Sequence, residues 1–384
     1  MKFLFDLRST QPGGSGKRHG AGRYGEAIFR RMIELGINFS CYYDSRRWFN
    51  PDIKAVVENK EIELFDTAQR RLQEIINAEH FDRIFTYMLT DEELFLKNIE
   101  VFGTIHGIRA AETPPDDVSY FSVNENCDLK KRAVWYIRKA TRNFKLRKRR
   151  QERLFQKRYV ESNCHLITVS EHSKYAMQSY FPQIAKREVK VFYSPNTSLK
   201  TEGIKMKSEF PAEKYFLCVS ANRWEKNVIR AIIAFDRLKS FGQLQDFKMK
   251  ISGATKDEMR CCLQNPASFD FLGYVSDEEL EQLYAKAYLF VFPSLNEGFG
   301  YPPIEAMKYG TPVIASAFSS MAEICASGAL FFNPLSIEEI MNRMLMMTDS
   351  STHEKFSKLG YQQYLRVKSR QDKDLDELIK YITS

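Results

Sequence analysis

The chain places two carboxylates, Glu297 and Glu305, on either side of a turn that holds two glycines and two prolines. The apolar run at 287–292 predicts a buried strand before this turn. Pro302 and Pro303 are typical of a first helical turn, where no amide donor is needed. A glycine loop between a strand and a helix presents backbone N–H groups to an anion. The pattern therefore predicts a phosphate site flanked by acceptors for hydroxyl groups, as a nucleotide sugar requires. A surface turn with two solvated glutamates is the alternative.

We expect the helix after this turn to end near Gly310 and to hold Glu305 about two turns from its start. A carboxylate beside phosphate is repelled, so we expect Glu297 to point towards hydroxyl donors instead. Transfer of a sugar from such a donor releases a diphosphate, whose charge must be neutralised. Arg223 and Lys226 follow a predicted strand at 216–220 and can supply that charge. An exposed helix N-terminus is the alternative for these two cations.

No metal is expected, because the chain lacks a D-x-D pair at a strand end. A D-x-D pattern at Asp372 and Asp374 lies in a polar terminal helix and is interpreted as a solvated face. The seven cysteines are odd in number and lack C-x-x-C spacing, which favours free thiols in a reducing compartment. Neither a membrane-spanning run nor the layout of a signal peptide is recognised, so a cytoplasmic location is expected.

Three further segments carry candidate residues. A glycine-rich loop at 11–24 separates the first predicted strand from the first helix and can approach a ligand closely, although flexible loops look alike. His106 ends a predicted strand at 101–106, where either a structural or a ligand-binding histidine is consistent with the sequence. Ser276 and Glu279 form the pattern of a capping box at the start of the next helix.

In their order and spacing these segments resemble the retaining glycosyltransferases of family 4, which have the GT-B fold. The resemblance implies that Glu297 contacts the donor sugar and that Glu305 holds the nucleotide ribose. It further implies catalytic roles for His106, Glu297, Arg223 and Lys226. Amides of Gly298, Phe299, Gly300 and Tyr301 would meet the phosphates, the backbone at Val275 would meet the base, and Gly22 would border the donor. Gly20, Arg23, Tyr24 and His106 would lie on the acceptor side.

Two departures from the family pattern affect individual roles. Gly107 stands where the family commonly has aspartate after the histidine, so His106 is not assigned as a general base. Arg223 stands two positions later than the arginine of many relatives, where this chain has Ala221. The retaining chemistry of the family transfers the sugar on one face, with a donor phosphate oxygen accepting the acceptor's proton. No metal and no other cofactor is implied.

The formal net charge of +8 is concentrated in one segment. Residues 130–158 hold 14 Lys or Arg and one acidic residue, with aromatic and aliphatic side chains between them. An anionic membrane surface suits such a basic stripe, with Arg147, Lys148, Arg149 and Arg150 as its densest part. Nucleic acid or a merely solvated helical face are the alternatives. The protein is therefore expected on the cytoplasmic face of a membrane.

Alternating strand and helix patterns predict an α/β protein, and the GT-B fold implies two Rossmann-like, doubly wound domains that face each other across a cleft. An acceptor-side domain is expected at 1–196 and a donor-binding domain at 197–368. Helices are expected at 354–366 and 372–382. The second helix belongs to a C-terminal segment, 369–384, and one arrangement for this segment is packing on the N-terminal domain.

The expected function is transfer of a sugar from a nucleotide sugar to a glycan or lipid-linked acceptor in polysaccharide synthesis. A GT-B hydrolase or epimerase of nucleotide sugars is the enzymatic alternative. A basic nucleic-acid-binding α/β protein is the alternative from another class, and it would not need the two glutamates.

Overall fold

The computed structural model describes residues 1–12, 20–113, 161–195, 214–221, 223–254 and 263–384, with positions 153, 156 and 159. The chain divides into two compact units. The first unit comprises the described residues of Met1–Ile108, Gln151–Leu199 and Lys368–Ser384, and the second those of Arg109–Arg150 and Lys200–Val367. This division does not test the domain bounds 1–196, 197–368 and 369–384, which stay a prediction.

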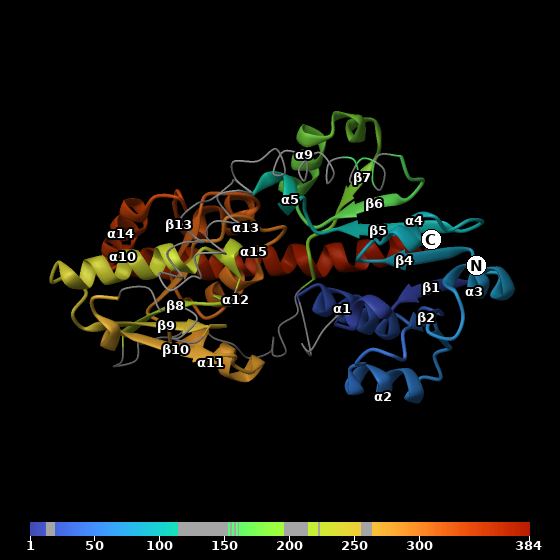
Figure 1. The fold of residues 1–384 in the computed structure, drawn as a ribbon, viewed down its shortest axis with the longest axis horizontal. Coiled ribbons are helices and arrows are strands. Elements are labelled where there is room, and N and C mark those ends of the chain that lie inside the picture. Colours follow the sequence, from blue (N-terminus) through green and yellow to red (C-terminus); the bar gives the residue numbers. More distant parts are fainter. Residues whose placement is uncertain are drawn as a thin grey trace, which may run out of the picture. The chain divides into compact units, whose positions relative to one another are not determined.

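The first unit is built on seven parallel strands in the order β3-β2-β1-β4-β5-β6-β7 (Figure 1). All four residues of β1 are buried, as expected for a strand covered on both faces. The strands are β1 (Phe3–Asp6), β2 (Ser40–Tyr43), β3 (Leu64–Asp66), β4 (Arg83–Thr86), β5 (Glu100–Ile105), β6 (His165–Thr168) and β7 (Val189–Val191). The helices are α1 (Gly20–Glu34), α2 (Pro51–Asn59), α3 (Leu72–Glu79), α4 (Asp91–Leu94) and α9 (Glu171–Tyr180).

The second unit contains six parallel strands in the order β10-β9-β8-β11-β12-β13. The strands are β8 (Lys214–Cys218), β9 (Phe247–Ser252), β10 (Phe269–Gly273), β11 (Leu289–Phe292), β12 (Val313–Ser316) and β13 (Ala329–Phe332). The helices are α5 (Arg109–Glu112), α10 (Val228–Ser240), α11 (Asp277–Lys286), α12 (Tyr301–Met307), α13 (Met321–Cys325) and α14 (Ile337–Met346). The prediction of two doubly wound parallel sheets is thus confirmed.

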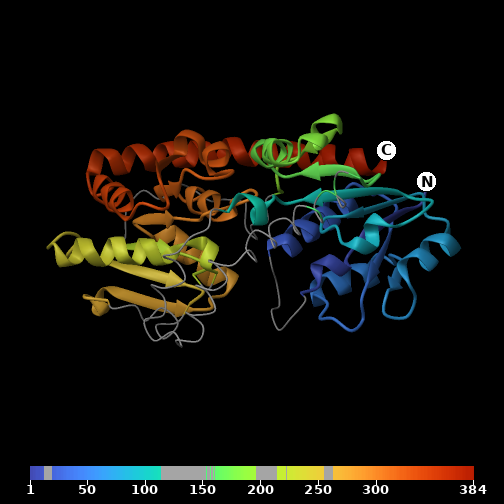
Figure 2. The ribbon, with the colours of Figure 1, turned by 45° about the horizontal axis from the view of Figure 1, so that its top comes forward.

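Helix α10 covers one face of the second sheet, as Figure 2 shows. Its inner side carries Val228, Ile232 and Phe235, which pack against Phe216 of β8 and Met249 of β9 in one buried cluster. Apolar residues at this spacing form a single stripe on a helix. The packing of this stripe sets the orientation of α10 on the sheet. It therefore also sets where the loop between β8 and α10 ends.

One long helix, α15 (Ser350–Thr383), replaces the two helices predicted at 354–366 and 372–382. The sequence between them contains no proline or glycine, so nothing in it interrupts the helical hydrogen bonds. Val367 and Gln371 in this stretch are buried, so packing also holds it in the helix. The prediction of two separate helices is therefore wrong.

The interpretation of Asp372 and Asp374 as a solvated pair is also half wrong. Asp372 does face solvent and pairs with Lys368, at 2.6 Å from Oδ2 to Nζ. Asp374 is buried, and its Oδ2 accepts a hydrogen bond of 2.8 Å from the backbone N–H of Tyr193. Residues two apart on a helix point in different directions, which separates their environments.

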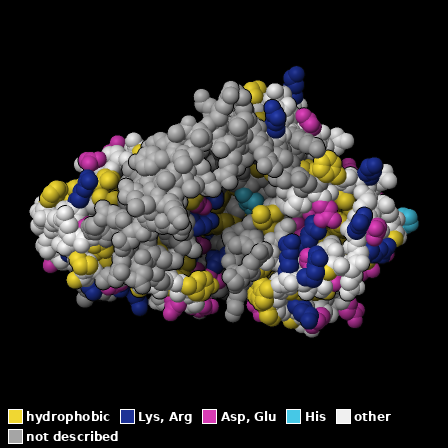
Figure 3. Space-filling view, in the orientation of Figure 1, with side chains coloured by type: hydrophobic (Ala, Val, Ile, Leu, Met, Phe, Trp, Pro, Cys, Tyr) yellow, Lys and Arg dark blue, Asp and Glu magenta, His cyan; other side chains and the backbone are white. Residues whose placement is uncertain are grey.

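The basic stripe at 130–158, with Arg147, Lys148, Arg149 and Arg150, lies outside the described residues apart from positions 153 and 156. On the face shown in Figure 3, basic and acidic side chains of the first unit lie intermixed, so neither sign dominates the described surface there. Within the described part of the chain, no helix has both the length and the apolar composition that crossing a bilayer requires.

Candidate active site

The loops that follow β8 and β11 meet at the carboxyl edge of the second sheet. β8 and β11 are neighbouring strands at the point where the strand order reverses, which is where parallel α/β sheets bind ligands. The loop after β8 carries Lys226, and the loop after β11 carries Glu297. The Lys226 ammonium donates to the Glu297 carboxylate, and Ser294 Oγ donates to the same carboxylate oxygen at 2.7 Å. The two predicted residues are thus brought into direct contact.

This ion pair is almost fully withdrawn from water. The Lys226 side chain is 5% exposed and that of Glu297 is 9% exposed, and the ring of Phe292 lies 5.2 Å from the ammonium. Burial, reinforced by the nearby charges of Arg223 and Arg109, lowers the pKa of Lys226 despite the favourable effect of Glu297. Burial alone would raise the pKa of Glu297, but Lys226, Ser294 and Arg109 together hold it below its usual value. Glu297 is therefore an anion at neutral pH.

In the structure the Glu297 carboxylate accepts hydrogen bonds from a protein hydroxyl and an ammonium, and its contact with ligand hydroxyls stays a prediction. Its backbone is fixed as well, because the N–H of Glu297 donates to Ser319 Oγ at 2.9 Å. Ser320 Oγ donates to the carbonyl oxygens of Glu297 and Phe299, at 3.0 Å each. Two serines that precede α13 therefore hold the glycine turn in place.

Gly300 is required by this turn for two reasons. Its φ of 99° lies in the left-handed region, where side chains are strained. A Cβ at this position would also lie 2.0 Å from the terminal methyl of Met321. The four predicted donor-side positions, Gly298, Phe299, Gly300 and Tyr301, thus form the turn that leads into α12.

Glu305 lies less deep in its helix than predicted. Helix α12 begins at Tyr301, so Glu305 is its fifth residue and lies just over one turn from the start. Gly300 has left-handed backbone angles and lies outside the helix, so the prediction of about two turns is wrong. Glu305 is half-buried, and its charge is one of the influences that raise the pKa of Tyr309, after burial and the Glu281 carboxylate.

Glu225, which directly precedes Lys226, contacts two arginines and the loop after β11. Its side chain is 10% exposed, and its carbonyl oxygen accepts from the N–H of Leu295 at 2.8 Å. Its Oε1 accepts from Arg109 Nη1 at 2.9 Å and lies 3.9 Å from Arg223 Nε. Arg223 is thus placed beside Lys226, as the sequence analysis expected, and Arg109 joins them from α5. We call Arg109, Arg223, Glu225, Lys226 and Glu297 the charge cluster.

Asn227 secures the loop after β8. The residue has left-handed backbone angles, with φ 54°, and its Nδ2 donates to the carbonyl oxygens of Pro293 and Pro334, at 2.9 and 2.7 Å. A second tie comes from α5, where Glu112 Oε2 accepts from Asn296 Nδ2 at 2.9 Å. The residues that flank Lys226 and Glu297 are therefore clamped together by side-chain to backbone and side-chain to side-chain bonds.

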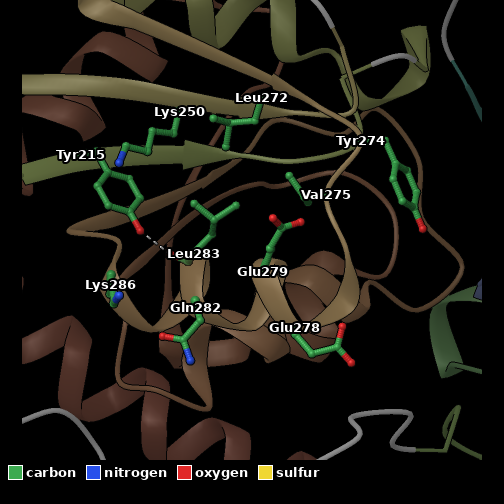
Figure 4. Close-up of a pocket in the computed structure, with 10 residues that line it drawn as sticks. All are labelled: Tyr215, Lys250, Leu272, Tyr274, Val275, Glu278, Glu279, Gln282, Leu283 and Lys286. Carbon is green, nitrogen blue, oxygen red and sulfur yellow. Dashed lines mark hydrogen bonds between the residues drawn. The ribbon is translucent and has the colours of Figure 1, made fainter.

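A cavity of about 620 Å³ lies where α11 faces the strands β8, β9 and β10 (Figure 4). Tyr274 and Val275, the predicted base-contacting turn, form one end of its lining. Tyr215 and Lys250 lie at the other end, with Lys250 Nζ 4.3 Å from the Tyr215 ring centroid. The carboxylate of Glu279 points towards Val275 and accepts from the N–H of Ser276 at 2.7 Å, so the predicted capping box is confirmed.

His106 lies in the first unit, immediately after β5. Its Nε2 is 2.9 Å from the carbonyl oxygen of Tyr87, which can only accept, so Nε2 carries the proton. The ring of Tyr24 packs edge-on against the imidazole, with ring centroids 4.9 Å apart. Tyr24 is 1% exposed and its hydroxyl lies 3.3 Å from Thr104 Oγ1. The ring of Tyr24 therefore helps to fix the orientation of the His106 imidazole. Tyr24 lies in α1, which also contains Gly20, Gly22 and Arg23.

Comparison with known proteins decides the family of the second unit. Residues 200–363 match the family model described as glycosyl transferases group 1. This segment is a glycosyl transferases group 1 domain. The chain is 33% identical over 189 residues to the O-antigen chain mannosyltransferase RfbU of Salmonella typhimurium, which covers 47% of this chain and 50% of that protein. It is 28% identical over 218 residues to the O-antigen chain mannosyltransferase B of Escherichia coli, covering 51% and 57% of the two chains. The chain thus spans about half the length of these relatives.

The whole chain has the fold of known glycosyltransferases. The structure of Anabaena HepE in complex with UDP and glucose superposes with a TM-score of 0.65 at 16% identity, over 99% of each chain. At this identity the likeness concerns the fold alone, and it confirms the GT-B fold that the sequence predicted. The group 1 domain carries the charge cluster apart from Arg109, together with Glu305, Val275 and the cavity.

The sequence analysis gave no role to four residues of the site, Arg109, Glu225, Ser294 and Asn296. Arg109 follows His106 by three positions, so its place after a strand end was a usable signal. Ser294 and Asn296 flank the acidic turn but resemble ordinary loop residues. Their importance follows only from the adjacency of β8 and β11.

Proposed function

We propose that this protein is a retaining glycosyltransferase of family 4 that transfers a sugar from a nucleotide sugar to a glycan or lipid-linked acceptor in polysaccharide synthesis. The observation that carries the proposal is the buried Lys226–Glu297 pair at the switch point of the group 1 domain. A structural protein has little reason to bury a charge pair at a sheet edge, because desolvation offsets most of the attraction. A site that must hold both diphosphate and sugar does have such a reason.

Each element has a defined task in this proposal. Lys226 and Arg223 neutralise the diphosphate, and the glycine turn at 298–301 approaches it with backbone amides. Glu297, ionised and fixed by Ser294, accepts hydrogen bonds from sugar hydroxyls. Glu305 accepts from the ribose, and the base lies at the Val275 end of the cavity. His106 contacts the sugar or orients the acceptor from the first unit.

The chemistry proposed for the transfer keeps the anomeric configuration. The bond from the anomeric carbon to the diphosphate oxygen breaks as the bond to the acceptor oxygen forms on the same face. A phosphate oxygen of the leaving diphosphate takes the acceptor's proton. No cofactor and no metal takes part in this scheme, since side-chain cations carry the charge.

Mannose is the sugar that the relatives favour. Both curated relatives described above are named as mannosyltransferases of O-antigen chains. HepE was solved with UDP and glucose, which shows that a protein of this fold binds a nucleoside diphosphate. We therefore propose a mannosyl donor and a cell-envelope polysaccharide as product, with the protein working at the cytoplasmic face of the membrane through its basic stripe at 130–158.

The proposal is tested by donor binding followed by transfer. GDP-, UDP- and ADP-sugars are screened for thermal stabilisation of the protein, and the donor that binds is supplied in radiolabelled form with lipid-linked acceptors. We expect one nucleotide class to stabilise the protein and label to enter the lipid fraction, with EDTA leaving turnover unchanged. Free sugar as sole product would favour the hydrolase alternative. Activity that survives Glu297→Gln and Glu305→Gln would contradict the site.

A further inference from the structure

The guanidinium of Arg109 reaches solvent beside the Lys226–Glu297 pair. Its side chain is 47% exposed and that of Arg223 is 45% exposed, whereas the side chains of Glu225, Lys226 and Glu297 are each at most 10% exposed. The two guanidiniums are therefore the most exposed charged groups of the charge cluster.

Glu225 holds both guanidiniums without exhausting them. Arg109 uses Nη1 for its bond of 2.9 Å to Glu225 Oε1, and Arg223 Nε lies 3.9 Å from the same oxygen. An arginine has five N–H donors in a planar fork, so donors of both residues are left for a further anion. Arginine forks match phosphate oxygens bidentately. The Glu225 carboxylate thus holds the guanidiniums of Arg109 and Arg223 close to each other.

Helix α5 places Arg109 by two further contacts. The N–H and the hydroxyl of Thr113 both donate to the carbonyl oxygen of Arg109, at 2.9 and 2.8 Å. One turn along, Glu112 is bound to Asn296, which directly precedes Glu297. α5 is thus fastened to the loop after β11 and to the loop after β8. Arg109 is not an incidental surface residue that happens to meet an acid.

We propose that Arg109 is a third cation for the donor diphosphate, anchored with Arg223 on Glu225. This inference deepens the proposed function and rests on it. It also accounts for the position of Arg223, which stands two positions later than the arginine of the family pattern. In this chain two guanidiniums, those of Arg223 and Arg109, would take the place of that single arginine. Glu225 acts as a positioning residue for both, and the diphosphate of a nucleotide sugar is the ligand class.

The test measures binding of nucleoside diphosphates and of the matching nucleosides by calorimetry on the full chain. UDP, GDP and ADP are compared with uridine, guanosine and adenosine. We expect Arg109→Ala to weaken diphosphate binding about 10- to 100-fold, as the loss of a charge-assisted bond predicts, and to leave nucleoside binding unchanged. If Arg109 only stabilised the fold, its loss would not weaken diphosphate binding while leaving nucleoside binding unchanged.

Arg237→Ala is the matched control. Arg237 belongs to the same unit, is 49% exposed and pairs with Glu338 at 3.3 Å, away from the charge cluster. Its loss should change diphosphate affinity less than twofold. Arg109→Lys serves if the alanine variant does not fold, and it should weaken binding about 3- to 10-fold because the fork is lost while the charge remains.

The outcomes separate the inference from the proposed function. Diphosphate binding by Arg109→Ala within twofold of the unaltered protein would overturn the role of Arg109 and leave the transferase proposal standing. An unaltered protein that binds none of the three diphosphates would overturn the proposed function, and the inference with it. Equal losses for diphosphate and nucleoside would also overturn the inference, because they indicate a general disturbance of the site.

Discussion

Lys226 and Glu297 form a buried ion pair although they are 71 positions apart in the sequence. The pair exists because β8 and β11, which precede the two loops, are adjacent strands. Leu289 of β11 pairs with Phe216 of β8, so both loops leave the sheet at the same edge. The contact between Lys226 and Glu297 depends on this adjacency.

The first prediction concerns the energy of this pair. Glu297→Gln and Lys226→Met each leave one buried charge without its partner, which costs about 3–5 kcal/mol of the free energy of unfolding. The double variant should lose clearly less than the sum, since it buries no unpaired charge. Urea unfolding of the four proteins measures the coupling. Strictly additive losses would show that the two groups do not interact.

The second prediction follows from the lowered pKa of Lys226. A lysine whose pKa lies below the ordinary 10.5 loses its proton earlier in the folded protein than in the unfolded chain. Between the two pKa values the unfolded chain binds more protons, so deprotonation favours the folded state while it removes a cation from the site. Affinity for the nucleoside diphosphate should therefore fall as pH rises, at a pH below 10.5.

Lys226→Met provides the control for this pH profile. Arginines stay protonated throughout the range, so the weak binding that remains in the variant should not change with pH. A decline of the same shape in the variant would assign the titration to another group.

The third prediction concerns the turn at Gly300. Gly300→Ala places a strained left-handed residue at φ 99° and drives its Cβ into the terminal methyl of Met321. We expect a loss of about 1–2 kcal/mol from the backbone, and a smaller further loss because the flexible end of the Met321 side chain must shift. Gly242, at φ 76° with open space around it, is the matched site. Gly242→Ala should show the backbone loss alone, and equal losses at both sites would contradict the role of Met321.

The fourth prediction separates the two aspartates of α15. Asp374→Ala leaves the N–H of Tyr193 without its acceptor, which should lower the free energy of unfolding by about 1–3 kcal/mol. Asp372→Ala removes only an exposed pair with Lys368 and should change it by less than about 0.5 kcal/mol. Thermal melting of both variants measures the difference. Similar melting temperatures would contradict the buried contact.

The fifth prediction tests the basic stripe. Replacement of Arg147, Lys148, Arg149 and Arg150 by serine removes four cations, each worth about 1 kcal/mol near an anionic surface. The protein should then no longer float with vesicles that contain anionic lipid. Vesicles of neutral lipid serve as the control. Unchanged flotation would mean that this stripe does not bind the membrane.

The prediction from sequence was strongest where local chemistry decides the structure. The turn with Gly300, the capping box of Ser276 and Glu279 and the alternating elements follow from neighbouring residues, and the structure contains all of them. The prediction failed where distant segments supply the partner. The burial of Asp374 depends on Tyr193, and the role suggested for Arg109 depends on Glu225, which is 116 positions away.

The sequence by itself determined that two parallel sheets form, that Glu297, Arg223 and Lys226 follow strand ends, and that Glu305 lies in the helix after the glycine turn, because periodicity and turn chemistry act over a few residues. Strand order is different, since any strand of a parallel sheet can in principle pair with several others. Only the tertiary structure decided that β8 lies beside β11. That adjacency turned a lysine and a glutamate in separate loops into one buried pair. The tertiary structure likewise decided that Arg109 of α5 meets Glu225.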